Sequence, residues 1–413
     1  MGSKLGQHII DILRGKKKII AENRELDSAK KLFEYGYHAK PQKEIKFEWA
    51  QSPEAENKND LKILEKLKFL YANNKEIFSP TEVSDMWQDI FIPKHQKLFN
   101  YLKENEDEKA LDFLNNMCKN QATYGFFAGC ENDDETQNQK KKIKKNKYTN
   151  IQDQSLKFYL IDPLVSFAEW LNVIPAESVD NTSKEDYIYY SPETLIDLIE
   201  KKLGFEIKVP EFQTGLTGIP IHKNCINNRH IIYLYIALRI KEFCKDIENP
   251  RICEIGGGVG LLSFYCNLIG LKNVTMVDIP SVSFISSYFM MKNMPERKFI
   301  LSTGDNKYDE PEAIKILFPK YFNEAPDNQF DIVVNCDSFP EINKEVTREY
   351  LETIKRTSRI FYSINHEWHE KSLIDNNVPN LTDYVGGFDK KFRNLFWLRR
   401  GYIEELYKIN RGA

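Results

Sequence analysis

Hydrophobic and polar residues follow a helical period in the first half of the chain. In residues 60–71 apolar side chains recur every three or four positions, as one face of a helix requires. Ser191-Pro192-Glu193 predicts a helix start, because serine caps, proline suits the first turn and an acid complements the helix dipole. This helix is expected to end at Gly204. A tyrosine-rich apolar run over 228–240 predicts another helix.

From residue 251 the pattern changes to short apolar strands that alternate with helices. Strands are expected at 251–255, 274–278, 298–303, 330–336 and 359–365. Helices are expected near 259–270, 281–293, 311–318 and 343–357. This alternation predicts a doubly wound α/β sheet. Residues 395–398 and 402–409, around Arg400-Gly401, are expected to form an antiparallel hairpin at its end.

The same patterns predict four segments in the 413 residues. Residues 1–130 form a helical N-terminal region, and 131–150, which contain almost nothing apolar, form a charged linker or loop. Residues 151–250 form a helical lead-in that covers a pocket, and 251–413 form the ligand-binding α/β domain. Residues 9–20 mix apolar and basic side chains, which favours packing against the body or a second subunit, as in a homo-oligomer, over contact with a membrane surface.

Composition and charge indicate which kinds of partner and which cellular compartment are expected. The chain has 58 basic and 61 acidic residues and a net charge of -3, without the concentrated basic face of nucleic-acid binders, so no nucleic-acid partner is expected. No stretch has the length of a membrane span. The seven cysteines are odd in number and lack zinc-ligand spacing, which predicts reduced, mostly buried thiols. Because the sequence shows neither a membrane span nor the apolar block of a secretory signal, a cytoplasmic location is expected.

A glycine-rich turn carries the strongest chemical pattern. The segment RICEIGGGVG places a short apolar strand before the turn, and an apolar helix follows it. Glycines there permit a sharp turn and let a ligand approach bare backbone near the amide groups of a helix N-terminus. A dinucleotide-binding turn, G-x-G-x-x-G, does not fit, because Leu261 or Ser263 stands at its last glycine position. The glycines of the turn are Gly256, Gly257, Gly258 and Gly260.

Three acidic residues lie at or just after the ends of the first three strands of this domain. Glu254 stands two positions before the first glycine, and Asp278 ends the next strand, where its carboxylate can accept hydrogen bonds from both hydroxyls of a ribose. In the pattern E-x-G-x-G-x-G the chain resembles the class I methyltransferases that use S-adenosyl-L-methionine. The resemblance implies a Rossmann-like doubly wound methyltransferase sheet, with Glu254 facing the methionine end of the cofactor and Asp305 bonding its adenine. Asp278 and Asp305 have a capping or turn role as the alternative.

Two polar segments are expected at the carboxyl edge of the sheet, where open α/β sheets bind ligands. They are residues 335–342 (NCDSFPEI) and 363–369 (SINHEWH). With the glycine turn, they resemble a bacterial family of sugar O-methyltransferases over about residues 225–370. The resemblance implies methyl transfer to a sugar hydroxyl, in a nucleotide sugar or a surface glycan. The alternatives are a small-molecule or phosphate-ester methyltransferase and a non-catalytic binding subunit.

Removal of the proton from a sugar hydroxyl calls for a base near the methyl donor. Asp337, Glu341, His366 and Glu367 are expected to converge there, and His366 is the first choice because imidazole accepts protons near neutral pH. The same oxygen-rich cluster can hold Mg²⁺. The absence of an acidic pair on neighbouring positions favours a site without metal.

Overall fold

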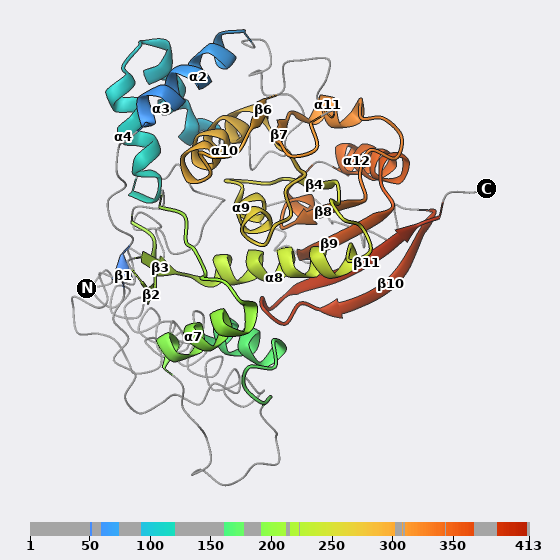
Figure 1. The fold of residues 1–413 in the computed structure, drawn as a ribbon. Helices are drawn as coiled ribbons and strands as arrows, with labels where there is room; N and C mark the ends of the chain where they lie inside the picture. Colours follow the sequence, from blue (N-terminus) through green and yellow to red (C-terminus); the bar gives the residue numbers. More distant parts are fainter. Residues whose placement is uncertain are drawn as a thin grey trace, which may run out of the picture. The chain divides into compact units, whose positions relative to one another are not determined.

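The computed structural model of the chain is shown in Figure 1. It describes residues 50–51, 59–73, 92–119, 161–176, 191–211, 215–222, 224–301, 308, 310–342, 344–366 and 386–410. The chain divides into two compact units, one formed by residues 1–48 and 138–204 and the other by residues 49–137 and 205–413. The expected linker at 131–150 and the mixed segment at 9–20 lie outside the described residues.

In the first unit, residues 161–170 and α7 (Pro192–Leu203) are helical. Ser191 caps α7, since its hydroxyl accepts a hydrogen bond from the amide of Thr194 at 3.2 Å. The helix ends at Gly204, whose φ of 78° lies in the left-handed region that glycine adopts without strain. Both ends of α7 are therefore where the sequence predicted them.

The second unit contains a sheet of eight strands in the order β10-β11-β9-β8-β4-β5-β7-β6 (Figure 1). The strands are β4 (Ile252–Ile255), β5 (Val274–Val277), β6 (Phe299–Leu301), β7 (Ile314–Leu317), β8 (Ile332–Cys336), β9 (Ile360–His366), β10 (Phe388–Leu395) and β11 (Tyr402–Ile409). The six strands from β4 to β9 pair in parallel, whereas β11 is antiparallel to β9 and to β10. The predicted doubly wound sheet with a C-terminal hairpin is confirmed.

Helices lie on both faces of this sheet because each central strand is buried on both sides. One face packs against α11 (Pro319–Asn323) and α12 (Lys344–Thr357) through a core that includes Val333, Phe361 and Leu351. On the other face α8 (Asn228–Phe243) packs on α9 (Leu261–Leu268).

Buried polar contacts attach α8 to the C-terminal hairpin. Glu404 of β11 is 3% exposed and accepts hydrogen bonds from Tyr235 of α8 at 3.1 Å and from Tyr362 of β9 at 2.6 Å. Arg239 of α8 lies 3.6 Å from the same carboxylate. Since a buried charge is tolerated only when it is paired, these contacts fix the position of α8 over the sheet.

Two predicted elements are wrong. The helix expected near 311–318 is replaced by β7 and the short α11, because the run Ile314–Leu317 pairs in parallel with both β5 and β6. A short apolar run fits a strand or a helix by periodicity, and the neighbouring strands decide it. The first hairpin strand is β10 at Phe388–Leu395, earlier than the expected 395–398. Its lysines and arginine suit an exposed edge strand and hide the apolar pattern.

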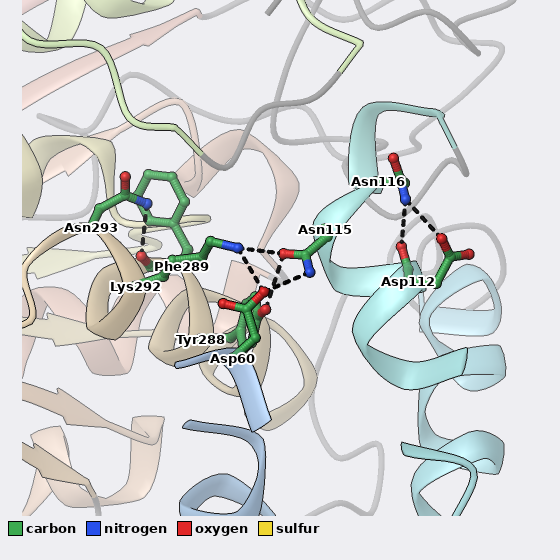
Figure 2. Close-up of polar contacts among 8 residues, drawn as sticks. All are labelled: Asp60, Asp112, Asn115, Asn116, Tyr288, Phe289, Lys292 and Asn293. Atoms are coloured by element: carbon green, nitrogen blue, oxygen red, sulfur yellow. Dashed lines mark hydrogen bonds and ion pairs between the residues drawn. The ribbon is translucent and has the colours of Figure 1, made fainter. Parts of the chain in front are cut away.

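Three helices of the second unit dock on the sheet domain through α10 (Pro280–Asn293). They are α2 (Asp60–Asn73), α3 (Ile92–Lys103) and α4 (Asp107–Asn115). Figure 2 shows the buried polar contacts of α2 and α4 with α10. Lys292 pairs with Asp60 at 2.9 Å and donates to Asn115 at 2.7 Å, and Tyr288 donates to the same amide oxygen at 3.0 Å. These helices therefore belong to the same structural unit as the sheet.

A small antiparallel sheet leads into α8. Its strands are β1 (Ala50–Gln51), β2 (Thr217–Ile221) and β3 (Asn224–Ile226). After β3, Asn227 caps α8 by accepting from the Arg229 amide at 3.0 Å, while Nδ1 of His230 accepts from the Asn227 amide at 3.0 Å. Burial lowers the pKa of His230 to about 3, so this imidazole is neutral. The capped start of α8 sets the direction of the Arg229 side chain.

Six cysteines in the described ranges are buried, and none of them forms a disulfide with another described residue; they are Cys118, Cys225, Cys244, Cys253, Cys266 and Cys336. Cys130 lies outside the described residues. Among the helices that the structure describes, none is long and apolar enough to cross a membrane.

Candidate functional site

The glycine-rich turn joins β4 to α9 at the carboxyl edge of the sheet. Gly256, Gly258 and Gly260 have φ angles of 74°, 55° and 90°, a region that side-chain-bearing residues rarely adopt. A Cβ on Gly257 would lie 2.2 Å from a side-chain carbon of Met276. The turn thus needs glycine both for its backbone angles and for close packing against neighbouring side chains.

Asp278 holds this turn against the end of β5. Its two carboxylate oxygens accept hydrogen bonds from the amides of Gly258 and Ile279, each at 2.8 Å. Burial raises the pKa of Asp278 to about 7, although both amide hydrogen bonds act to lower it. A carboxylate has about four acceptor sites, so two remain for a ligand. The carboxyl at this position is therefore a hydrogen-bonding group both for the turn and for a bound molecule.

The raised pKa of Asp278 predicts how stability changes with pH. The folded state favours the neutral acid, so this contribution to stability is present at low pH and is lost as the pH rises through about 7. Asp278→Asn removes the ionisation. We expect the variant to gain stability relative to the wild type between about pH 5 and about pH 8, measured by urea unfolding of the ligand-free chain. Asp389→Asn, on exposed β10, is the control. The same difference in stability between Asp278→Asn and the wild type at both pH values would contradict the raised pKa of Asp278.

Glu254 is a buried carboxyl that lies beneath the turn. It is 1% exposed, and a Cβ built on Gly257 would lie 3.2 Å from its Oε2 atom. No residue in the described part of the chain donates a hydrogen bond to either of its oxygens. Burial, and then the charge of Asp278, raises the pKa of Glu254 well above its usual range. A buried acceptor without a donor is costly, so this position favours a ligand that brings a cation or a donor.

A polar network connects the ends of β8 and β9 to the same turn. Asn335 and Ser338 donate to the carbonyl of Ile255 at 3.0 Å and 3.1 Å, and the amide of Asn365 donates to Asn335 at 2.9 Å. A Cβ on Gly256 would lie 2.1 Å from the hydroxyl oxygen of Ser338. The described parts of the two polar segments expected at the sheet edge, which include Asn335, Ser338 and Asn365, therefore connect to the glycine turn.

Asp337 follows β8 and is held by two guanidinium groups and a phenol. One oxygen accepts from Arg229 at 2.8 Å and from Arg399, and the other accepts from Tyr402. Burial alone would raise the pKa of Asp337, but Arg229 and Arg399 outweigh it and hold that pKa well below its usual range. A carboxylate so stabilised is a weak base, which favours a positioning role for Asp337.

His366 ends β9 and lies opposite Tyr402 in the pairing of β9 with β11. The two rings pack edge to face, with centroids 5.3 Å apart and an angle of 69° between the planes. The hydroxyl of Tyr402 in turn donates to Asp337. His366 and Asp337, both predicted from sequence, are thus connected through a residue that the sequence analysis did not select.

The other candidate residues are less well placed by the structure. Glu341 ends the short 3-10 helix η4 (Phe339–Glu341) after β8 and is partly buried. Glu367 and Asp305 lie outside the described residues. Within the described ranges, no three His, Cys, Asp or Glu side chains are grouped as ligands of a metal ion. A site without metal stays a prediction.

Tyr233 of α8 is a further residue of this region that sequence reasoning missed. Burial raises the pKa of its hydroxyl well above the usual range, and the neighbouring Cys336, Glu254 and Asp337 add to the shift while Arg229 opposes it. Tyr233 therefore interacts with both the glycine-turn side and the Asp337 side. In the sequence, Tyr233 could have been selected because it lies one helical turn after Arg229.

Comparison with known proteins gives distant similarities. No protein-family model matches the chain. It is 24% identical over 207 residues to the ribosomal protein L11 methyltransferase of Staphylococcus carnosus (strain TM300), a match that covers 48% of this chain and 61% of that protein. The chain thus spans about three fifths of the length of this relative.

Two solved structures illustrate the structural similarity. The magnesium protoporphyrin IX methyltransferase of Synechocystis PCC 6803, solved with bound SAM, has a TM-score of 0.31 at 11% identity, covering 62% of this chain and 94% of that one. The PH0226 protein of Pyrococcus horikoshii OT3 has a TM-score of 0.34 at 13% identity, covering 44% of this chain and 91% of that one. At these TM-scores the structural similarity supports no conclusion beyond the strand order described above.

Proposed function

We propose that the chain is a methyltransferase that uses S-adenosyl-L-methionine and transfers the methyl group to a hydroxyl of a sugar, in a nucleotide sugar or a glycan. The observation that carries the cofactor assignment is Glu254, a carboxyl 1% exposed without a hydrogen-bond donor among the described residues, next to bare glycine backbone. S-adenosyl-L-methionine has an ammonium group that suits this carboxyl. The sequence similarity to a methyltransferase supports the same assignment.

The residues present fit this cofactor at two further points. The turn from Gly256 to Gly260 leads into the N-terminus of α9, whose backbone amide groups favour the negatively charged carboxylate of the cofactor's methionine part. Asp278 at the end of β5 has acceptor capacity for two ribose hydroxyls. When bound, the cofactor supplies an electrophilic methyl group on a sulfonium. The chain must then align an acceptor hydroxyl and remove its proton.

His366 is our candidate for the proton acceptor. It lies at the carboxyl end of β9, and β8 and β9 connect to the glycine turn through Asn335 and Ser338. The edge-to-face packing on Tyr402 limits the directions that the imidazole can take. Since Asp337 is held by two arginines, it orients Tyr402 and leaves proton transfer to a side chain of higher basicity.

Cofactor binding is tested by titration with S-adenosylhomocysteine, the product of methyl transfer. Asp278→Ala is expected to weaken its affinity by about 2–4 kcal/mol, since two hydrogen bonds to a carboxylate are lost. Isothermal titration calorimetry measures the change. Asp389→Ala removes an exposed aspartate of β10 and should leave the affinity unaltered. Unchanged affinity in Asp278→Ala would overturn the assignment of the ribose site, and binding of NAD in place of S-adenosylhomocysteine would overturn the cofactor.

The acceptor class is tested separately. The chain is incubated with S-adenosyl-L-methionine and a panel of sugar nucleotides, free sugars and neutral small molecules, and mass spectrometry records the gain of a methyl group. Methylation of sugars supports the proposal. Methylation only of other small molecules would move the assignment to a small-molecule methyltransferase, whereas cofactor binding without turnover on any class would favour a non-catalytic subunit.

A further inference from the structure

The cluster around Asp337 holds more positive than negative charge. Two guanidinium groups, from Arg229 and Arg399, share one carboxylate oxygen, and Tyr402 donates to the other oxygen. Arg229 is always protonated, and its side chain is only 10% exposed. Within the described part of the chain no second carboxylate pairs with either arginine. Among the described residues, two guanidinium charges thus share the single carboxylate of Asp337.

Asp337 does not need Arg399 to be satisfied. The carboxylate already accepts from Arg229 at 2.8 Å and from Tyr402, and its own backbone amide donates to the Ile364 carbonyl at 2.9 Å. A purely structural role would be fulfilled by those contacts. Each buried ion carries a desolvation cost. The Arg399 guanidinium adds such a cost although Asp337 is already satisfied without it, which a purely structural cluster does not require.

Arg399 is also the more accessible of the two arginines. Its side chain is 29% exposed, against 10% for Arg229. The guanidinium carbon lies 3.9 Å from the centroid of the Tyr402 ring, so the planar group stacks on the phenol. Among the described residues its side chain donates only to Asp337, through one terminal nitrogen. The rest of the guanidinium edge keeps its donors, in the fork geometry that matches an oxyanion.

Arg399 is connected through Tyr402 to His366, the residue that we assign to the acceptor hydroxyl. Arg399 lies in the turn between β10 and β11, three residues before Tyr402, and Tyr402 stands opposite His366 in the sheet. If His366 receives the proton of the acceptor hydroxyl, a group bound at Arg399 belongs to the same acceptor molecule. This step rests on the proposed function.

We propose that Arg399, supported by Arg229, binds an anionic oxygen group of the acceptor, so that the methylated sugar carries a phosphate or a carboxylate. Glycosyl phosphates and uronic acids share this chemistry. A neutral sugar would leave the remaining donors of the Arg399 guanidinium without an anionic acceptor on binding, which penalises the wrong substrate. Arg399 is therefore a specificity residue, distinct from the cofactor site at Glu254 and Asp278.

The experiment uses the full chain and simple anions, so that the sugar need not be known. Inorganic phosphate and acetate represent the two anion sources, and glucose 1-phosphate, glucuronate and glucose represent charged and neutral acceptors. Thermal unfolding at matched ionic strength reports binding, because a ligand that binds only the folded state raises Tm. The variants are Arg399→Gln, Arg399→Lys and the control Arg400→Gln, which removes the neighbouring exposed charge from the same turn.

We expect phosphate or acetate to stabilise the wild type and Arg400→Gln equally and Arg399→Gln much less, with roughly tenfold weaker apparent affinity. Arg399→Lys should keep part of the effect, because it retains the charge but lacks the fork. The anion that loses more affinity in Arg399→Gln identifies the acceptor group, and its sugar should bind more tightly than glucose. Identical responses of Arg399→Gln and the wild type to all five compounds would overturn the proposal.

Titration of the same proteins with S-adenosylhomocysteine separates this inference from the proposed function. Arg399→Gln should bind S-adenosylhomocysteine as the wild type does, because Glu254 and Asp278 are intact. Loss of cofactor binding in Arg399→Gln would make Arg399 part of the cofactor site and overturn its assignment to the acceptor. Failure of the wild type to bind S-adenosylhomocysteine would contradict the proposed function, while the anion titrations would still report on Arg399.

Discussion

His366→Ala is expected to lower kcat by roughly 10²- to 10⁴-fold, the usual contribution of a general base, and to leave the affinity for S-adenosylhomocysteine nearly unchanged. The imidazole lies at the end of β9 and packs on the Tyr402 ring, with the two ring centroids 5.3 Å apart, whereas the Asp278 carboxylate that we assign to the cofactor follows β5. A sugar hydroxyl is a weak acid, so removal of the base raises the barrier of the chemical step more than it weakens binding. Steady-state kinetics with the methylated sugar, together with calorimetry, measure the two effects.

Two variants make this test specific. His222→Ala removes an exposed imidazole after β2, 44% exposed, and should keep normal turnover. Glu367→Gln tests the neighbouring carboxylate that the sequence offers as the rival base. Near-normal kcat in His366→Ala combined with collapse in Glu367→Gln would transfer the base role to Glu367. A loss limited to KM would make His366 a binding residue.

Asp337→Ala is expected to lower the free energy of unfolding by about 3–5 kcal/mol, because removal of one partner of a buried ion pair leaves the other charge uncompensated. The stranded groups are Arg229, with a side chain 10% exposed, and the hydroxyl of Tyr402. Burial disfavours the charged guanidinium, and in the wild type the Asp337 carboxylate outweighs that effect and raises the pKa of Arg229. Urea unfolding monitored by circular dichroism gives the change.

The matched control is Asp327→Ala, which removes a partner of Arg356 at 2.8 Å. Both side chains of that pair are exposed, at 69% and 39%, so the expected loss is about 0–1 kcal/mol. A loss in Asp337→Ala as small as in the control would show that the arginine cluster is solvated and would remove its positioning role. A large loss in Asp337→Ala that Asp337→Asn largely restores would assign the stabilisation to hydrogen bonds more than to charge.

Local sequence patterns predicted the elements whose formation depends on nearby residues. The capped helix from Ser191 to Gly204 and the glycine turn after β4 are of this kind, since a side chain that caps or a glycine at positive φ acts within a few positions of itself. The doubly wound sheet was also predicted from the alternation of strands and helices, whereas the order of its strands came from the tertiary structure. The candidate residues Glu254, Asp278, Asp337 and His366 could all be selected by their place at strand ends.

Strand pairing in the tertiary structure decided the two elements that the sequence predicted wrongly. The run Ile314–Leu317 is a strand because β5 and β6 offer it hydrogen bonds on both sides. The edge strand β10 pairs only with β11, and its exposed charged residues conceal it in the pattern. The partners of Ile314–Leu317 lie outside any local window, whereas β10 pairs with its neighbour in the hairpin and was missed because of its charged composition.

The chemistry of the site also depends partly on the sequence alone and partly on the tertiary structure. The sequence by itself determined the fold class, the glycine turn and the acids at the strand ends, because these depend on residue type and spacing. Only the tertiary structure brought Arg229 and Arg399 to one oxygen of Asp337, with positions 108 and 62 residues away from it along the chain. It also left Glu254 buried without a donor among the described residues. Charge balance and burial depend on groups that the fold brings together. They make the Asp337 carboxylate a weak base, and they make the Glu254 carboxyl the candidate for binding a ligand.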